Sequence, residues 1–285
     1  MDRRIIALYD EYTHAPLDRR VFLERLTKLA GGTAAAYALL PLLENNYANA
    51  EMIPANDPGL ISERITIPNV SGDVKAYFTH PKDSSKRGGV VVIHENRGLN
   101  AHIEDVARRV AKAGFNAVAV DLLSPMGGTP QNEDQARDMI GKLDAKQTVA
   151  NLRSAVAWLK NRPDSNGKVG VVGFCWGGGM VNQLAVAEPN LNAAVAYYGP
   201  QPPADQVANI KAPLLLHYAG LDERINQGIP GYKNALDQAG KKYTVYIYDG
   251  VDHAFNNDTN AARYNKDAAE LAWGRTIEFF KMNLT

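Results

Sequence analysis

Residues 169–179 read VGVVGFCWGGG, and this stretch decides the fold. Its first half is a run of β-branched and small residues, which is typical of a strand buried on both faces of a parallel sheet. Its second half places Cys175 between Gly173 and Gly177, in the pattern G-x-C-x-G. In this pattern a nucleophile occupies a tight turn from strand to helix, and the flanking glycines let neighbouring backbone approach. The stretch therefore predicts a strand, a sharp turn that presents the Cys175 thiol, and a helix.

Strand-like and helix-like segments alternate on both sides of this turn. The strand-like runs are 64–68, 74–79, 89–94, 115–120, 169–174, 193–198, 213–218 and 243–248. The segments with helical spacing are 103–113, 131–160, 177–186, 232–239 and 261–282. Such alternation predicts a mostly parallel sheet of about seven to eight strands with helices on both faces. With the nucleophile turn, it predicts one α/β-hydrolase domain over residues 51–285.

The composition is that of an ordinary globular protein. Of the 285 residues, 45% are hydrophobic and 22% are charged, and the formal net charge is +0. A nucleic-acid binder usually carries a basic excess, so we expect no nucleic-acid partner. The single cysteine excludes an internal disulfide and a cysteine-based metal cluster. A lone thiol is more often a buried, inert side chain than a nucleophile, so its neighbours must decide its role.

A cysteine nucleophile needs a histidine base and an acid that orients the histidine. In this fold the three follow the chain order nucleophile, acid, histidine. Asp222 follows the strand-like run 213–218 and is the expected acid, with the adjacent Glu223 as its rival. His253 lies in the loop after the last strand-like run and is the expected base. Asp252 ranks lower as its partner, because adjacent side chains of an extended segment point apart.

This triad predicts covalent catalysis on an ester-like carbonyl. With support from His253, the thiolate attacks the carbonyl and forms a thioester, which water then hydrolyses. The oxyanion needs two backbone N–H donors, which we expect from Trp176, directly after the nucleophile, and from Asn96. Beside Asn96, Glu95 is placed at the mouth of the site, where a carboxylate can keep the resting thiol protonated. Alternatively, Glu95 pairs with Arg97 or is a surface charge.

Together these residues resemble the dienelactone hydrolase family (carboxymethylenebutenolidases) over residues 62–284. The matching features are Glu95, SNGKVG at 165–170, the cysteine-bearing turn at 173–179, YYG at 197–199, Asp222 and His253. The resemblance implies hydrolysis of a small-molecule lactone or enol ester without metal or cofactor. It also implies that Glu95 holds the resting Cys175 thiol until substrate displaces it.

The chain departs from this family at two positions that concern the substrate. The family enzyme that acts on dienelactone holds the substrate carboxylate with arginines after the fourth strand and shortly after the histidine. At these places this chain has LLSPM (122–126) and NN (256–257). Either Arg97 or Arg263 substitutes for them, or the substrate is not an anionic dienelactone. The candidate substrate-binding side chains are Arg97, Tyr198 and Phe255.

The first fifty residues are expected to be a separate segment. DRRVFL at 18–23 resembles a twin-arginine export motif, a mildly apolar run spans 26–43, and Ala48-Asn49-Ala50 suits a signal peptidase. The apolar run is too weak for a stable membrane span. This order predicts export to the periplasm and cleavage after Ala50. The alternative is a cytoplasmic protein with a retained N-terminal helix that packs on the domain or on a partner.

Two other function classes compete with an ester or lactone hydrolase. Another acyl bond (thioester, peptide or acyl-sugar) would use the same triad, because pocket residues decide the substrate. A non-catalytic binding protein on this fold is disfavoured by the complete triad. A metalloenzyme is also disfavoured, because the nearest ligand pair, His94 and His102, lies on different elements without a clear third ligand. The sequence carries no prediction of oligomeric state.

Overall fold

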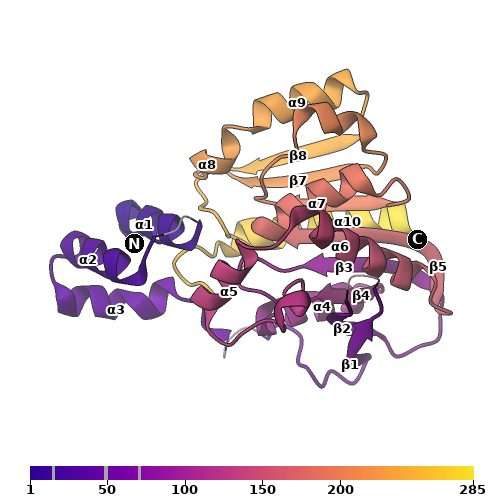
Figure 1. Cartoon of the computed structure of the whole chain (residues 1–285), viewed down its shortest axis with the longest axis horizontal. Helices are drawn as coiled ribbons and strands as arrows, with labels where there is room; N and C mark the ends of the chain where they lie inside the picture. The colour runs from indigo at the N-terminus through magenta and orange to yellow at the C-terminus, as the bar shows by residue number, and fades with distance from the viewer. Residues whose placement is uncertain (15–16, 48–50, 70–71) are drawn as a thin grey trace.

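The computed structural model describes residues 1–14, 17–47, 51–69 and 72–285, which are built around one eight-stranded sheet (Figure 1). The strands are β1 (Leu60–Ile67), β2 (Val74–Pro81), β3 (Arg87–Ile93), β4 (Asn116–Val120), β5 (Ser165–Phe174), β6 (Ala193–Tyr197), β7 (Leu214–Ala219) and β8 (Tyr243–Tyr248). Their order in the sheet is β1-β2-β4-β3-β5-β6-β7-β8. β2 is antiparallel to both of its neighbours, and the pairs from β4 through β8 are parallel. This topology confirms the predicted α/β-hydrolase fold.

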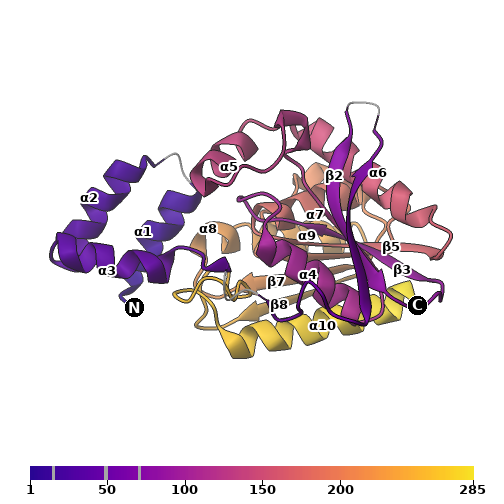
Figure 2. The ribbon, with the colours of Figure 1, turned by 90° about the horizontal axis from the view of Figure 1, so that it is seen from below.

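Helices cover both faces of this sheet. The helices and 3-10 turns are α1 (Arg3–His14), α2 (Arg19–Ala30), α3 (Thr33–Leu43), α4 (Ala101–Lys112), η2 (Ser124–Met126), α5 (Glu133–Ile140), α6 (Ala145–Lys160), α7 (Trp176–Ala187), η3 (Ala204–Asn209), α8 (Glu223–Asn226), α9 (Ile229–Gln238) and α10 (Lys266–Leu284). α4 and α10 pack on one face, and α6, α7 and α9 pack on the other (Figure 2). Neighbouring residues of a strand, such as Val171 and Val172, belong to opposite cores, as the period of two requires.

The strand positions follow the apolar runs closely, except that β1 begins at Leu60 and β5 at Ser165, each four residues before its predicted run. The predicted hairpin forms between β1 and β2, with Ile67 opposite Val74, although Ser71 of its turn lies outside the described residues. The strand-like run predicted for β5 begins at Val169, but β5 already begins at Ser165. There the backbone pairs with the start of β3, where Arg87 lies opposite Ser165. Hydrogen bonding to a neighbouring strand thus extends β5 beyond its apolar run.

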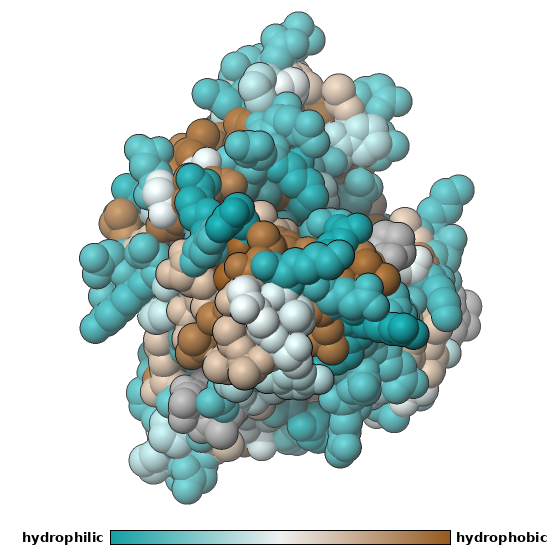
Figure 3. Space-filling view, turned by 90° about the vertical axis from the view of Figure 1, so that its left-hand side faces the viewer, coloured by the Kyte–Doolittle hydropathy of each residue, from teal (hydrophilic) through white to brown (hydrophobic). Residues whose placement is uncertain are grey.

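The first 47 residues form three helices at one end of the molecule, beside the hydrolase domain (Figures 1 and 2). They share an apolar core of their own, whose largest members are Tyr9, Tyr12, Phe22 and Leu26. Hydrogen bonds tie this N-terminal segment to the loop after β8: the Ala262 amide donates to the Leu42 carbonyl at 3.1 Å. Figure 3 shows this end of the molecule, where apolar residues lie among hydrophilic ones. Its exposed large hydrophobic residues include Val21, Tyr37 and Leu42.

The arginine pair of the export-like motif lies in the first turn of α2. Asp18 caps this helix, and its side chain accepts a hydrogen bond from the Arg20 amide at 2.7 Å. Arg19 pairs with Glu44 at 2.8 Å. Within the described ranges no single helix is long and apolar enough to cross a membrane; α2 and α3 pass by length and composition together, but bend by 113°. Residues 48–50 lie outside the described residues, so export and cleavage stay predictions.

Candidate active site

Cys175 occupies the turn between β5 and α7 in a strained backbone conformation. Its φ of 55° and ψ of −120° are values that L-residues rarely adopt. Its amide donates to the Tyr197 carbonyl at 3.0 Å, which fixes the turn to β6. A Cβ on Gly177 would lie 2.7 Å from the Ile93 carbonyl oxygen, and one on Gly173 would clash with the Gly177 backbone. The glycines therefore let the turn hold the thiol at the start of α7, where the helix dipole favours a thiolate.

Asp222 and His253 meet at the carboxyl edge of the sheet, after β7 and β8 respectively. Nδ1 of His253 lies 2.5 Å from Oδ2 of Asp222, and each residue is 4% exposed. The rival Glu223 starts α8 with an exposed side chain, and Asp252 is half-buried beside the pair. Of the three acids considered from the sequence, Asp222 is the one that contacts His253.

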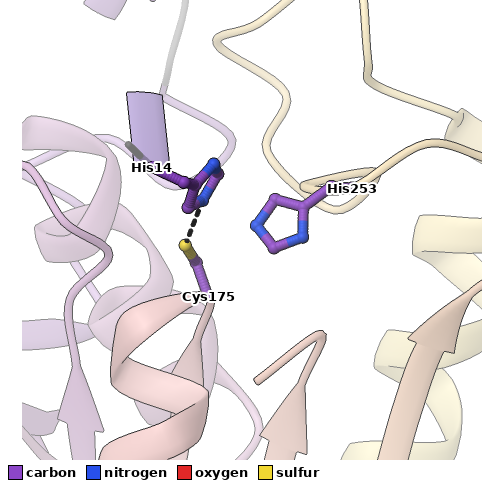
Figure 4. A group of neighbouring side chains, drawn as sticks. All are labelled: His14, Cys175 and His253. Carbon is purple, nitrogen blue, oxygen red and sulfur yellow. Dashed lines mark hydrogen bonds between the residues drawn. The ribbon is translucent and has the colours of Figure 1, made fainter. Parts of the chain in front are cut away.

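A second histidine enters the site from the N-terminal segment. His14 ends α1 and places its Nε2 3.0 Å from Sγ of Cys175 (Figure 4). Its ring meets that of His253 edge-on, with centroids 4.6 Å apart. Its Nδ1 lies 3.1 Å from Oδ1 of Asp10, one turn earlier in α1. One nitrogen of each histidine and the Cys175 sulfur lie within 4.8 Å of one another.

Sequence reasoning missed both His14 and Asp10. It expected the first fifty residues to be an export signal, or else a retained helix packed on the domain or on a partner, and weighed none of their side chains as site residues. Asp10 and His14 are four residues apart and therefore share one face of a helix, which is a readable signal. Nothing in the sequence, however, places that face against Cys175.

This cluster changes the acidity of the Cys175 thiol. Burial alone would raise the pKa of Cys175, but the positive charges of His14 and His253 lower that pKa to about 6. Burial disfavours the charged form of His253, but the negative charges of Cys175, Asp10 and Asp222 raise its pKa to about 10. The pKa of His14 is also raised despite burial, because of Cys175 and Asp10. Between pH about 6 and 10, these shifts favour a thiolate beside protonated imidazole.

The loop after β3 contributes Glu95, Asn96 and Arg97 to the lining of the cavity at Cys175. Glu95 is buried there, and its Oε2 accepts a hydrogen bond from Nδ2 of Asn257 at 2.7 Å. Nδ2 of Asn96 donates to the Thr13 carbonyl at 2.5 Å, which ties this loop to the end of α1. The hydrogen bond of the Cys175 thiol goes to the N-terminal segment, so a restraint of the thiol by Glu95 stays a prediction.

The structure separates the three predicted substrate-binding side chains. Arg97 is buried, and its guanidinium lies 3.4 Å from Oδ1 of Asp134 on α5. Tyr198 lies against His253, with ring centroids 4.9 Å apart, and its hydroxyl has no partner among the described residues. Phe255 is fully buried among other aromatic rings and lines neither of the two cavities at the site.

Two cavities border His253. The one that contains Cys175 has a volume of about 10 Å³, which is about the space of a single water molecule. The other has a volume of about 280 Å³ and is lined in part by Asp10, Asp222 and Arg263. Arg263 borders both cavities, so it is an arginine that a substrate next to Cys175 could reach.

His94 and His102, the pair considered as metal ligands from the sequence, have separate partners. Nε2 of His94 accepts from the Leu122 amide at 3.3 Å, and its ring stacks on Trp176. Nδ1 of His102 lies 3.0 Å from Oδ1 of Asp258. Neither belongs to the cluster around Cys175.

A cysteine on a strained strand-to-helix turn, followed in the chain by a hydrogen-bonded aspartate and histidine, fits the α/β-hydrolase fold. The model of the Dienelactone hydrolase family matches residues 74–284. The chain belongs to that family, and it is a hydrolase of the carboxylesterase kind.

Relatives and solved structures agree with this assignment. The chain is 32% identical over 278 residues to a "Putative carboxymethylenebutenolidase" of Methylorubrum extorquens, with 91% of this chain and 93% of that protein covered. It is 51% identical over 112 residues to a "Putative hydrolase fragment" of Escherichia coli K12, with 38% of this chain and 96% of the fragment covered. The crystal structure of a "Putative Dienelactone Hydrolase" from Klebsiella pneumoniae matches with a TM-score of 0.71 and 28% identity, over 78% of this chain and 98% of that chain.

The first prediction concerns the acidity of the thiol. Because Cys175 is the single cysteine, the ultraviolet absorbance of the thiolate reports on this residue alone. We expect wild type to titrate near pH 6. His14→Gln keeps a polar side chain but removes the positive charge, so it should raise the pKa of Cys175 by about 1–3 pH units.

His80→Gln is the matched control, because His80 lies on β2 and its Nδ1 bonds the Pro81 carbonyl oxygen. A Cys175 pKa that is the same in His14→Gln and His80→Gln would contradict the role of His14. Glu95→Gln in the same titration tests the restraint on the thiol: loss of a nearby negative charge should lower the pKa of Cys175 further, and an unchanged value would sink that role.

Proposed function

We propose that the protein hydrolyses a carboxylic ester or lactone through a triad of Cys175, His253 and Asp222. The observation that carries this proposal is the hydrogen bond of His253 to Asp222 at 2.5 Å. With Nδ1 engaged, the free nitrogen of His253 is Nε2, which is buried and has no partner among the described residues. His253 and Cys175 belong to one cluster, so His253 can act as the base for the proposed nucleophile.

The chemical steps follow from this arrangement. Sγ of Cys175 attacks the carbonyl carbon, and the electron pair of the carbonyl bond moves to its oxygen. His253 gives its proton to the leaving oxygen as the tetrahedral intermediate collapses to a thioester. Water, deprotonated by His253, then attacks the thioester, releases the acid and restores the thiolate.

Two backbone amides support stabilisation of the oxyanion. The amides of Trp176 and Asn96 have no acceptor within the described part of the chain. Trp176 is the first residue of α7, where the helix leaves its amides free to bind an anion. Donors aimed at a developing oxyanion contribute about 2.7–4 kcal/mol each to transition-state stabilisation.

Substrate needs more space than the resting site offers. A cavity of about 10 Å³ at Cys175 does not admit a lactone ring, because the end of α1 fills the approach to the thiol. In the proposed reaction, His14 moves aside and the substrate carbonyl takes its place next to Sγ. Oε1 of Glu95 is buried without a hydrogen-bond partner among the described residues, so it is free to accept from the thiol once His14 has moved.

Arg263 is the better candidate of the two arginines for a substrate carboxylate. Its Nε is buried without a hydrogen-bond partner among the described residues, and it borders both cavities. Arg97 also lines the cavity at Cys175, but its guanidinium donates to the Glu133 carbonyl at 2.9 Å and lies 3.4 Å from Oδ1 of Asp134. The guanidinium of Arg263 has a longer ion pair, 3.6 Å from Oδ1 of Asp10. An anionic lactone therefore fits the site with its carboxylate toward Arg263.

The second prediction tests the nucleophile. Cys175→Ala should lower kcat for p-nitrophenyl acetate and for a dienelactone by about 10⁴-fold or more, because no group replaces the attacking atom. For wild type, kcat/KM should rise with pH through about 6, as the thiol ionises, and fall near pH 10, as His253 loses its proton. Comparable turnover by the alanine variant on both substrates would falsify the assignment. If wild type hydrolyses the simple ester but not the dienelactone, the proposed mechanism stands and the lactone is excluded as the substrate class.

The third prediction tests the substrate charge. Arg263→Gln should raise KM for an anionic dienelactone by about tenfold or more, since a charged hydrogen bond is lost, and leave KM for neutral p-nitrophenyl acetate nearly unchanged. Arg97→Gln is the matched control and should not discriminate between the two substrates. Equal effects of Arg263→Gln on both substrates would remove the carboxylate from the proposal.

A further inference from the structure

We propose that His14, Cys175 and His253 form a binding site for a soft divalent cation, Zn²⁺ in the first place, which holds α1 closed over the thiol. The sequence led us to expect no metal, because His94 and His102, the nearest ligand pair, lie on different elements without a clear third ligand. The folded chain instead brings together one thiolate ligand and two imidazoles from three distant segments (Figure 4). Thiolate and imidazole are the ligands that zinc prefers.

The distances between the ligand atoms suit a small tetrahedral ion. Nε2 of His14 lies 3.0 Å from Sγ of Cys175, and the three ligand atoms lie within 4.8 Å of one another. With Zn–S near 2.3 Å and Zn–N near 2.0–2.1 Å, tetrahedral ligands lie roughly 3.3–3.6 Å apart. Side-chain shifts of about 1.5 Å or less would therefore bring all three into coordination.

Nδ1 of each histidine lies near the carboxylate of an aspartate. Nδ1 of His253 contacts the Asp222 carboxylate at 2.5 Å. Nδ1 of His14 is hydrogen-bonded to the main-chain carbonyl of Asp10 at 2.8 Å and lies 3.1 Å from its carboxylate. Histidines that bind a metal through one nitrogen usually donate the other N–H to a carboxylate or carbonyl, which fixes the ring orientation. Here both imidazoles are held so that Nε2 is the nitrogen available for a ligand.

The buried nitrogen of His253 is the second, independent sign of a ligand. His253 is 4% exposed, and its Nε2 has no hydrogen-bond partner among the described residues. A buried polar atom without a partner is costly, and a metal ion at this point would satisfy it. Three protein ligands leave a fourth coordination position for water.

A bound metal ion would join His14 of the N-terminal segment to Cys175 and His253 of the hydrolase domain. The metal would tie up Sγ of Cys175 and Nε2 of His253 and would fix the end of α1 in the place that substrate needs. The expectation that the metal inhibits hydrolysis rests on the proposed function, whereas the expectation that the metal binds does not. In a chain that retains His14, a bound metal ion would therefore block access of substrate to Cys175.

The test is metal binding by the full-length, tag-free protein, treated with chelator and checked by mass to retain His14. Co²⁺ is the probe, because a cobalt–thiolate bond gives a near-ultraviolet charge-transfer absorption. We expect wild type to bind one Co²⁺ per chain with this absorption, and Zn²⁺ to displace it. Asp10→Asn should weaken Co²⁺ binding by about 10–100-fold, and His14→Gln by more. His80→Gln should bind like wild type.

Each outcome decides one question. The site does not exist if wild type shows no Co²⁺ charge-transfer absorption, or if Cys175→Ser shows the same absorption as wild type. If His14→Gln and Asp10→Asn bind Co²⁺ as tightly as His80→Gln, the metal does not involve α1, and the proposal is overturned. Cobalt binding with the expected variants, in a protein that hydrolyses no ester, would leave the metal site intact and remove only the proposed function.

Discussion

The strained backbone at Cys175 is the constraint on which the rest of the site depends. The turn from β5 to α7 is possible because Gly173 and Gly177 let it pack directly on the neighbouring backbone. A positive φ at a non-glycine residue costs about 1–3 kcal/mol and persists only where its surroundings over-determine it. Here the Tyr197 carbonyl and the carbonyl at the end of β3 supply those surroundings. The strain aims the thiol at the carboxyl edge of the sheet, where the loops carrying Asp222 and His253 also arrive.

The N-terminal segment adds a second histidine, His14, to the electrostatic environment of the Cys175 thiol. His14 and His253 flank the thiol, and Nδ1 of each histidine lies near an aspartate, so Cys175 lies between two potential cations. The result is a thiol whose pKa lies near 6 although it is buried. The same packing leaves only about 10 Å³ of free space at the thiol. The contact that lowers the pKa of the thiol therefore also blocks substrate from it, and the proposed reaction requires the end of α1 to move aside.

The fold and the triad candidates could be predicted because their signals are local. β-branched runs, the glycines of 173–179 and the chain order of Asp222 and His253 are all visible along the sequence. The start of β5 at Ser165 was missed because its hydrogen bonds come from β3. Likewise, the position of His14 depends on packing between segments 161 residues apart. The pairing of Arg97 with α5 was hidden for the same reason, since it is set by tertiary structure and not by spacing.

The central claim is that Cys175 attacks the substrate and carries the acyl group. The most direct measurement is the mass of the protein after rapid mixing with p-nitrophenyl acetate and acid quench, followed by mapping of the modified peptide. The account predicts one added acetyl group, located on Cys175, in the wild type and none in Cys175→Ala. An acetyl group on another residue, or turnover of the ester by Cys175→Ala at the wild-type rate, would contradict it.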